Sequence, residues 1–95
     1  MHNFSYHNIK IEKDKYTNQI IVRGEITNLG GKNYATIAGR IVLFVKNTAI
    51  SNTVFVVNGL ASGTTKSFER IIDELDYSQV GKDITHYEIF TESGF

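Results

Sequence analysis

The stretch Gln19-Ile-Ile-Val-Arg-Gly-Glu-Ile-Thr-Asn28 decides the fold of this chain, because its side chains alternate between apolar and polar. Successive side chains of an extended chain point to opposite faces, so the alternation predicts a strand with one buried and one solvent-facing side. The buried face would carry Ile20, Val22 and Ile26, and the solvent-facing side Arg23, Glu25 and Thr27.

A second alternation over residues 36–46 predicts another strand. Residues 28–33 join the two stretches and include Gly30 and Gly31, which tolerate the positive φ that a reversing loop needs. We therefore expect two consecutive antiparallel strands. The inward face of the second would carry Ile37, Ile41, Leu43 and Val45, and its outward face Arg40, Val42, Phe44 and Lys46.

Shorter strand signals lie on both sides of this pair. Residues 54–57 form a β-branched and aromatic run closed by Asn58-Gly59, and residues 85–91 alternate again. The last strand would place Tyr87 and Ile89 inward and His86, Glu88 and Phe90 outward.

At the N-terminus the alternation changes phase between Tyr6 and Ile9, which predicts a bulge near His7 and Asn8.

Residues 64–80 fit two periods. Phe68, Ile71, Ile72 and Leu75 fall at helical spacing. The threonine-rich start of the segment favours a strand instead. We expect a strand as far as Ile72 and then a turn, with one short helical turn near residues 73–80. A helix over residues 65–77, in an α+β fold, is the alternative. Strand signals at intervals of about ten residues otherwise predict an all-β sandwich.

The composition excludes several classes of function. Ten basic and ten acidic side chains among 95 residues leave no concentrated basic surface for a nucleic acid or an anionic membrane. The chain has no cysteine, which excludes disulfides and thiolate metal sites, and no apolar run long enough to span a membrane. We expect no nucleic-acid partner and no membrane insertion of this segment.

Three short stretches carry a family resemblance. They are Gly24-Glu-Ile-Thr-Asn28, Ile41-Val-Leu-Phe-Val45 and Leu60-Ala-Ser-Gly63. They resemble the Gly-x-Val-x-Asn, Phe-x-Leu-Tyr-Asp and Leu-x-Pro-Gly elements of the FxLYD family of small immunoglobulin-like domains from bacteria and archaea. Phe68 is similar to a phenylalanine that follows the family's turn, and Tyr87 with Ile89 is similar to its closing strand.

The resemblance implies a fold and a location. The fold is an all-β, immunoglobulin-like antiparallel sandwich of about seven strands, forming a single domain over residues 1–95. Family members are frequent in cell-surface or membrane-anchored proteins and have no established catalysis. The resemblance thus implies an extracellular or envelope-attached module, while the sequence itself leaves a cytoplasmic location open.

Catalytic and metal-binding patterns do not stand out. His2, His7 and His86 lack the spacing of a metal site, and Glu25 and Glu88 fall on outward faces, where carboxylates usually form solvated ion pairs. We therefore expect no enzyme, no metal and no cofactor.

Two candidate binding surfaces remain. If the strands over residues 36–46 and 85–91 are neighbours, then Val42, Phe44 and Phe90 form an apolar stripe, and such patches mark association with another protein or with a second copy of the chain. The alternative is a carbohydrate or small-ligand site on loop tyrosines, whose rings can stack on sugars. Its residues would be Tyr16, Tyr34 and Tyr77.

Overall fold

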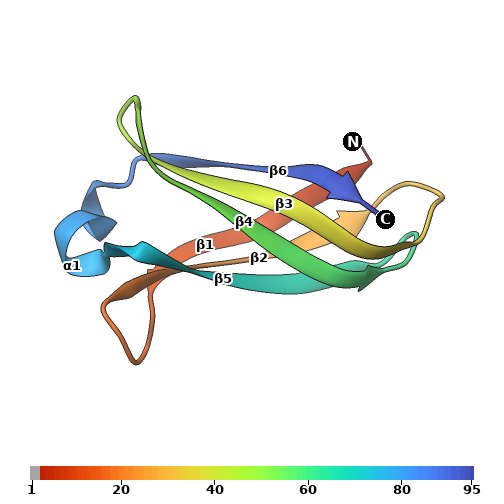
Figure 1. Ribbon diagram of the computed structural model, residues 1–95, viewed down its shortest axis with the longest axis horizontal. Coiled ribbons are helices and arrows are strands. Elements are labelled where there is room, and N and C mark those ends of the chain that lie inside the picture. Colours follow the sequence, from red (N-terminus) through yellow and green to blue (C-terminus); the bar gives the residue numbers. More distant parts are fainter. Residues whose placement is uncertain (1–2) are drawn as a thin grey trace.

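The computed structural model describes residues 3–95, which are largely antiparallel β-structure (Figure 1). Over this range six strands form two three-stranded sheets, ordered β1-β2-β5 and β4-β3-β6. A four-residue helix, α1 (Tyr77–Val80), and a short 3-10 helix (Gly81–Asp83) connect β5 to β6. The strands are β1 (Phe4–Lys13), β2 (Gln19–Asn28), β3 (Tyr34–Val45), β4 (Thr48–Leu60), β5 (Thr65–Asp76) and β6 (His86–Gly94).

The two sheets share one hydrophobic core. β2 and β5 of one sheet and β3 and β4 of the other contribute its buried side chains. Fully burying one isoleucine or leucine contributes about 1.5–3 kcal/mol before the entropy cost of ordering it, so these residues dominate the stability of the fold. The fully enclosed members are Ile20, Val22, Ile26, Ile37, Ile41, Leu43 and Ile72.

The predicted alternation is confirmed in both of the strands that the sequence marked most strongly. The predicted inward positions Ile20, Val22, Ile26, Ile37, Ile41 and Leu43 lie in the core, while Arg23, Glu25 and Thr27 lie on the outside. Val45, which was also predicted to face inward, is only half-buried and is not part of the core. The all-β prediction is thus confirmed, with six strands in residues 3–95 where the resemblance implied about seven.

Consecutive strands β2 and β3 do not pair with each other. β2 lies between β1 and β5, whereas β3 lies between β4 and β6, so residues 29–33 carry the chain from one sheet to the other. Both strands have an apolar inner face, and the two faces are buried across the shared core instead of side by side in one sheet.

The segment that follows Thr64 differs from the expectation. β5 continues as a strand through Ile72 to Asp76, so the predicted break at Ile72 is wrong, as is the alternative helix over residues 65–77. The helical turn occupies only Tyr77–Val80, within the second half of the predicted 73–80 range. Pairing with β2 explains the longer strand, because Gln19 is paired with Asp76.

Local backbone features follow the sequence in part. The predicted bulge is confirmed, because the β1–β2 register shifts between His7 and Lys10 and Asn8 has a φ of 53°. Within the described residues, positive-φ glycines occur at Gly59 (74°) and Gly63 (75°) but not in the loop of residues 29–33, where the sequence predicted them.

Asn28 holds the loops at one end of the molecule. Its fully buried side chain donates hydrogen bonds to the carbonyls of Lys32 (2.7 Å) and Leu60 (3.2 Å) and accepts one from Gly30 N–H (3.0 Å). Its backbone N–H donates to the carbonyl of Thr64 at 3.0 Å. One buried amide thereby ties the β2–β3 and β4–β5 connections together.

The edges of the two sheets meet along two seams. Along the β4–β5 seam, Arg70 Nε donates to the Val54 carbonyl (3.0 Å), Lys66 Nζ donates to the Gly59 carbonyl (3.3 Å), and Glu74 accepts a bond from β4. At the other seam the hydroxyl groups of Tyr6 in β1 and Thr91 in β6 are hydrogen-bonded.

Candidate functional site

The outer face of the β4-β3-β6 sheet brings together the residues of the predicted apolar stripe. β3 and β6 are neighbours, as the stripe required, and Arg40 of β3 is paired with Phe90 of β6. On its other side Arg40 is paired with Val54 of β4. Because directly paired residues share a face, Phe90 and Val54 flank Arg40 on the outer surface.

Exposure is unequal across this face. Phe90 is 42% exposed, whereas Val42 is only 7% exposed. Val42 belongs to the central strand, paired with Asn52 of β4 and Glu88 of β6, so neighbouring side chains cover it from both sides. Val42 consequently offers a partner little surface, in contrast to the expectation for the stripe.

Phe44 is also partly covered. Its ring stacks on the imidazole of His86, with ring centroids 4.4 Å apart and planes inclined by 7°. The Thr85 hydroxyl lies 3.1 Å from His86 Nδ1, within hydrogen-bonding distance. The half-buried Phe44 thus extends the face toward its α1 end without projecting from it.

Two valines that the sequence reasoning missed complete the face. Val54 is 41% exposed and Val56 is 55% exposed, while the alternate residues of β4 turn inward. Strand alternation around Phe55 was the available signal, but the sequence does not show that β4 lies beside β3. With Phe90, the two valines form what we call the outer apolar face.

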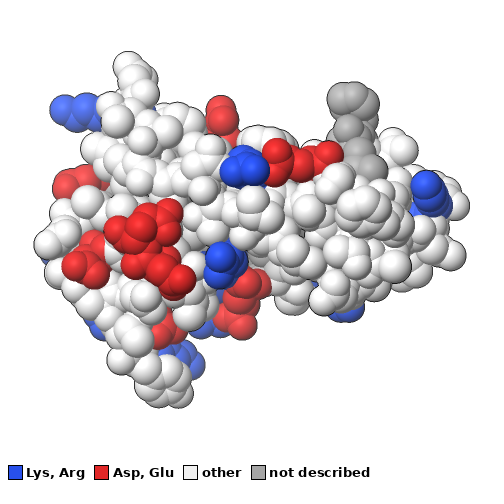
Figure 2. Space-filling model, viewed as in Figure 1, with Lys and Arg blue, Asp and Glu red and all other residues white. Residues whose placement is uncertain are grey.

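The guanidinium of Arg40 on this face is held by neighbouring side chains. Arg40 Nε contacts a Glu92 carboxylate oxygen at 2.8 Å, and an Arg40 terminal nitrogen donates to the Asn52 side chain at 2.7 Å. Figure 2 shows large uncharged areas on the visible side, with acidic residues gathered toward the α1 end. Val54, Val56 and Phe90 therefore form a group of exposed apolar side chains on one sheet face, and such groups often mark an interaction site.

The three loop tyrosines do not converge on one site. Tyr16 lies in the β1–β2 loop and is 90% exposed. This loop contacts α1 through a hydrogen bond from the Asn18 side chain to the Ser78 hydroxyl (2.7 Å). Tyr77 lies at the same end but packs against the core. Tyr34 begins β3 at the opposite end, where its ring contacts Phe4 with centroids 5.4 Å apart (Figure 1).

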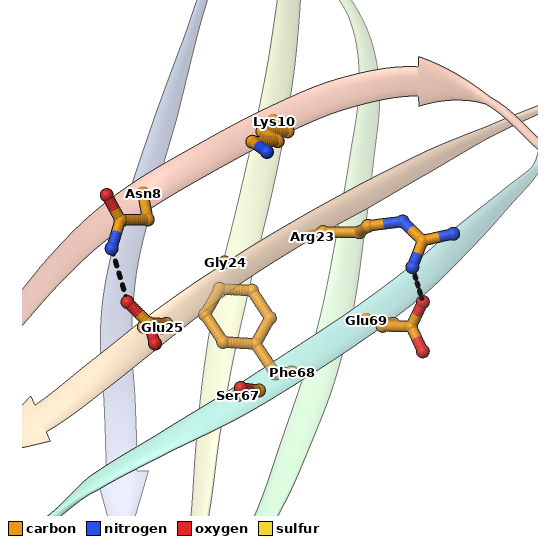
Figure 3. Close-up of a pocket in the computed structure, with 8 residues that line it drawn as sticks. All are labelled: Asn8, Lys10, Arg23, Gly24, Glu25, Ser67, Phe68 and Glu69. Carbon is orange, nitrogen blue, oxygen red and sulfur yellow. Dashed lines mark hydrogen bonds and ion pairs between the residues drawn. The ribbon is translucent and has the colours of Figure 1, made fainter.

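A depression lies on the outer side of the other sheet, beside the β1 bulge (Figure 3). It has a volume of about 490 Å³, and its charged groups largely neutralise one another. Guanidinium nitrogens of Arg23 lie 2.8 Å from a carboxylate oxygen of Glu69 and 3.4 Å from one of Glu12. The Glu25 carboxylate accepts a hydrogen bond from the Asn8 side chain. Most of the charged side chains in this hollow are therefore already paired with one another and are not free to bind a ligand.

The histidines are spread over the molecule. His7 lies on β1, and its Nε2 is 3.5 Å from a carboxylate oxygen of Glu25 on β2. His86 lies on β6 of the other sheet. His2 lies outside the described residues. Within residues 3–95 no three side chains of the metal-binding types lie close enough together to hold an ion.

Comparison with known proteins adds no identity. No family model, no curated protein and no solved structure matches the chain. The helices found in residues 3–95 are too short and too polar to cross a membrane.

Proposed function

We propose that this chain is a non-catalytic interaction module that binds another protein through its outer apolar face. The observation that carries the proposal is the grouping of Val54, Val56 and Phe90, each about half exposed, on one side of a three-stranded sheet. Burying apolar surface yields about 25 cal/mol per Å² before association costs, so three such side chains can form the centre of an interface.

Arg40 gives this face a directional element. Arginine is enriched in interface centres because its planar group both stacks and forms paired hydrogen bonds. Here Arg40 is paired with Val54 on one side and with Phe90 on the other, and its guanidinium is already oriented by Glu92 and Asn52. A partner that offers an acceptor opposite Arg40 would therefore bind with little further ordering.

The fold assignment that goes with this function is an immunoglobulin-like sandwich of the FxLYD type. Two antiparallel sheets around one core and the resemblance of residues 24–28, 41–45 and 60–63 support it. The same resemblance supports a place on the cell surface or in the envelope.

Site-directed cross-linking tests the proposed function. A photoreactive residue at Val56, in the chain expressed in its native host, should cross-link one discrete protein, while the same residue at the exposed Tyr16 should not. Phe90→Lys should abolish the Val56 cross-link, whereas Tyr16→Lys should leave it unchanged. Equal labelling from both positions, or a cross-link that survives Phe90→Lys, would contradict binding through this face.

Both lysine variants should remain folded. Surface substitutions away from caps, buried charges and the core usually change the free energy of unfolding by no more than about 0.5 kcal/mol. Denaturation curves of Phe90→Lys and Tyr16→Lys therefore serve as the stability control for the cross-linking experiment.

A further inference from the structure

Three of the four sheet edges in residues 3–95 are covered or interrupted. An edge strand exposes unpaired N–H and C=O groups that can template pairing with another chain, and proteins usually block them. The β4 and β5 edges face each other, with Lys66 and Arg70 of β5 donating to β4 carbonyls. The β1 edge is interrupted by the bulge after His7 and carries Lys10 and Lys13.

The β6 edge lacks these devices over its first half. β6 contains no lysine, arginine or proline, and its register with β3 is regular from His86 to Phe90. Its seam with β1 is bridged at Thr91, farther along the strand. Figure 1 shows the first half of β6 running along the upper rim of the molecule.

Side chains on both faces of this edge are exposed. His86, Tyr87 and Glu88 are consecutive exposed residues. The prediction that Tyr87 packs against the core with Ile89 is wrong for Tyr87, which is 41% exposed at the sheet edge, whereas Ile89 does pack against the core. An exposed aromatic ring at an open edge can form a cross-strand pair with a strand that is added there.

We propose that two copies of this chain pair through β6, antiparallel, and so join their β4-β3-β6 sheets into one six-stranded sheet. The contact is isologous, because the same edge serves both copies. The inference does not rest on the proposed function, since it uses the β6 edge and not the outer apolar face.

Charge selects the register. Only alternate residues of β6 point their backbone N–H and C=O groups away from β3, and these residues must pair with the same alternate set in the second copy. The register can therefore change only if even-numbered residues stay opposite even-numbered ones and odd-numbered residues opposite odd-numbered ones. Centring the two-fold axis on Glu88 would oppose two glutamates, which is unfavourable. Centring it on Tyr87 places His86 opposite Glu88 of the second copy, and this imidazole–carboxylate pair occurs twice.

The register centred on Tyr87 also uses the exposed ring. Tyr87 lies opposite its own counterpart, and cross-strand aromatic pairs are among the stabilising pairs of antiparallel sheets. A two-fold axis perpendicular to the joined sheet leaves both outer apolar faces on the same side. The dimer would therefore present Val54 and Phe90 of both copies on one continuous surface.

Sedimentation equilibrium of the full chain tests the pairing. The wild type should show a reversible monomer–dimer equilibrium. His86→Glu opposes two pairs of glutamates and should weaken the dimer by about tenfold, while His86→Lys should tighten it. The double variant His86→Glu with Glu88→Lys recreates two opposite-charge pairs and should restore dimerisation. Because His86→Lys and His86→Glu both remove the stacking on Phe44, a difference between them reports charge and not folding.

Val56→Lys is the matched control on the outer apolar face. Val56 lies on β4, on the far side of β3 from β6, so the dimerisation constant should not change. A wild type that stays monomeric at the highest attainable concentration would overturn the pairing. The same holds for a dimer that is lost in Val56→Lys but kept in His86→Glu. The cross-linking from Val56 that tests the proposed function can fail or succeed independently of these results.

Discussion

The ring of Phe55 in β4 stacks on the ring of Phe68 in β5, with centroids 4.6 Å apart and planes inclined by 14°. The edge of the Tyr6 ring meets both, at centroid distances of 6.1 Å. Because β4 belongs to one sheet and β5 and β1 to the other, this trio links the two layers at the middle of the core. Offset and edge-to-face aromatic pairs contribute about 0.5–1.5 kcal/mol beyond their burial.

Gly39 of β3 has no Cβ, and this leaves the space that the Phe55 ring occupies. A Cβ at Gly39 would lie 2.4 Å from the Phe55 ring and 3.0 Å from the Phe90 carbonyl oxygen, so backbone as well as side chain would have to move. We expect Gly39→Ala to lower the free energy of unfolding by about 1–3 kcal/mol, the usual cost of overpacking a core. Urea denaturation measures it.

Gly31 provides the matched control for this substitution. A Cβ there meets no atom within 4 Å, and the residue has no positive φ, so Gly31→Ala should leave stability unchanged or slightly raise it. Equal losses in Gly31→Ala and Gly39→Ala would show that steric conflict with Phe55 is not the cause.

Asn28 gives a second, independent prediction. Asn28→Ala removes the partner of the buried Leu60 carbonyl and of the half-buried Gly30 N–H, and a buried polar group without a partner costs about 1–3 kcal/mol. We expect a loss of about 2–4 kcal/mol and faster hydrogen exchange at Gly30. Asn58→Ala, at an exposed asparagine of β4, should cost far less, and a similar loss in both variants would contradict the role of the buried amide.

The sequence could predict what a single strand shows by itself. Alternation placed Ile20, Ile26 and Ile41 in the core, because a strand with one buried face must repeat every two residues. The phase change at His7 indicated the bulge for the same reason. These features depend only on residues near one another in the chain.

Features that depend on neighbouring strands were not predictable. The burial of Val42 is decided by side chains of β4 and β6, which flank the central strand. The continuation of β5 beyond Ile72 is decided by pairing with β2. The exposure of Val54 and Val56 marks a candidate surface only once β4 is known to lie beside β3.

Glu74 predicts acid-dependent stability at the β4–β5 seam. The hydrogen bond from Ser51 Oγ (2.7 Å) is the main cause that lowers the pKa of the Glu74 carboxyl below its ordinary value. A lowered folded-state pKa contributes stability that is present above the unfolded-state pKa and is lost as pH falls through the folded-state pKa. Wild type should therefore exceed Glu74→Gln in stability at neutral pH, by less than about 1 kcal/mol at this exposed position.

The difference between wild type and Glu74→Gln should narrow as the pH drops below 4.5, the ordinary value for this group. Urea denaturation across the acidic range measures it, and the Ser51→Ala background is the control. Without the Ser51 hydroxyl, Glu74→Gln should have a smaller effect at neutral pH, as a double-mutant cycle would show. A difference that does not vary with pH would contradict this origin.

The buried phenol of Tyr6 should make the protein lose stability at alkaline pH. Burial raises the pKa of the Tyr6 phenol above its ordinary value, although the hydrogen bond with Thr91 acts in the other direction. A raised folded-state pKa contributes stability that is complete below the unfolded-state value of about 10 and is lost as pH rises through the folded-state value. Tyr6→Phe should lower the free energy of unfolding by about 1 kcal/mol at neutral pH, because the hydrogen bond is lost. On going to strongly alkaline pH, this variant should lose less stability than the wild type.

Guanidinium denaturation at neutral and alkaline pH compares the two proteins. Tyr16→Phe, at a side chain that is 90% exposed, is the control. If Tyr6→Phe lost stability above pH 10 as steeply as the wild type, the buried phenol would not be the group responsible.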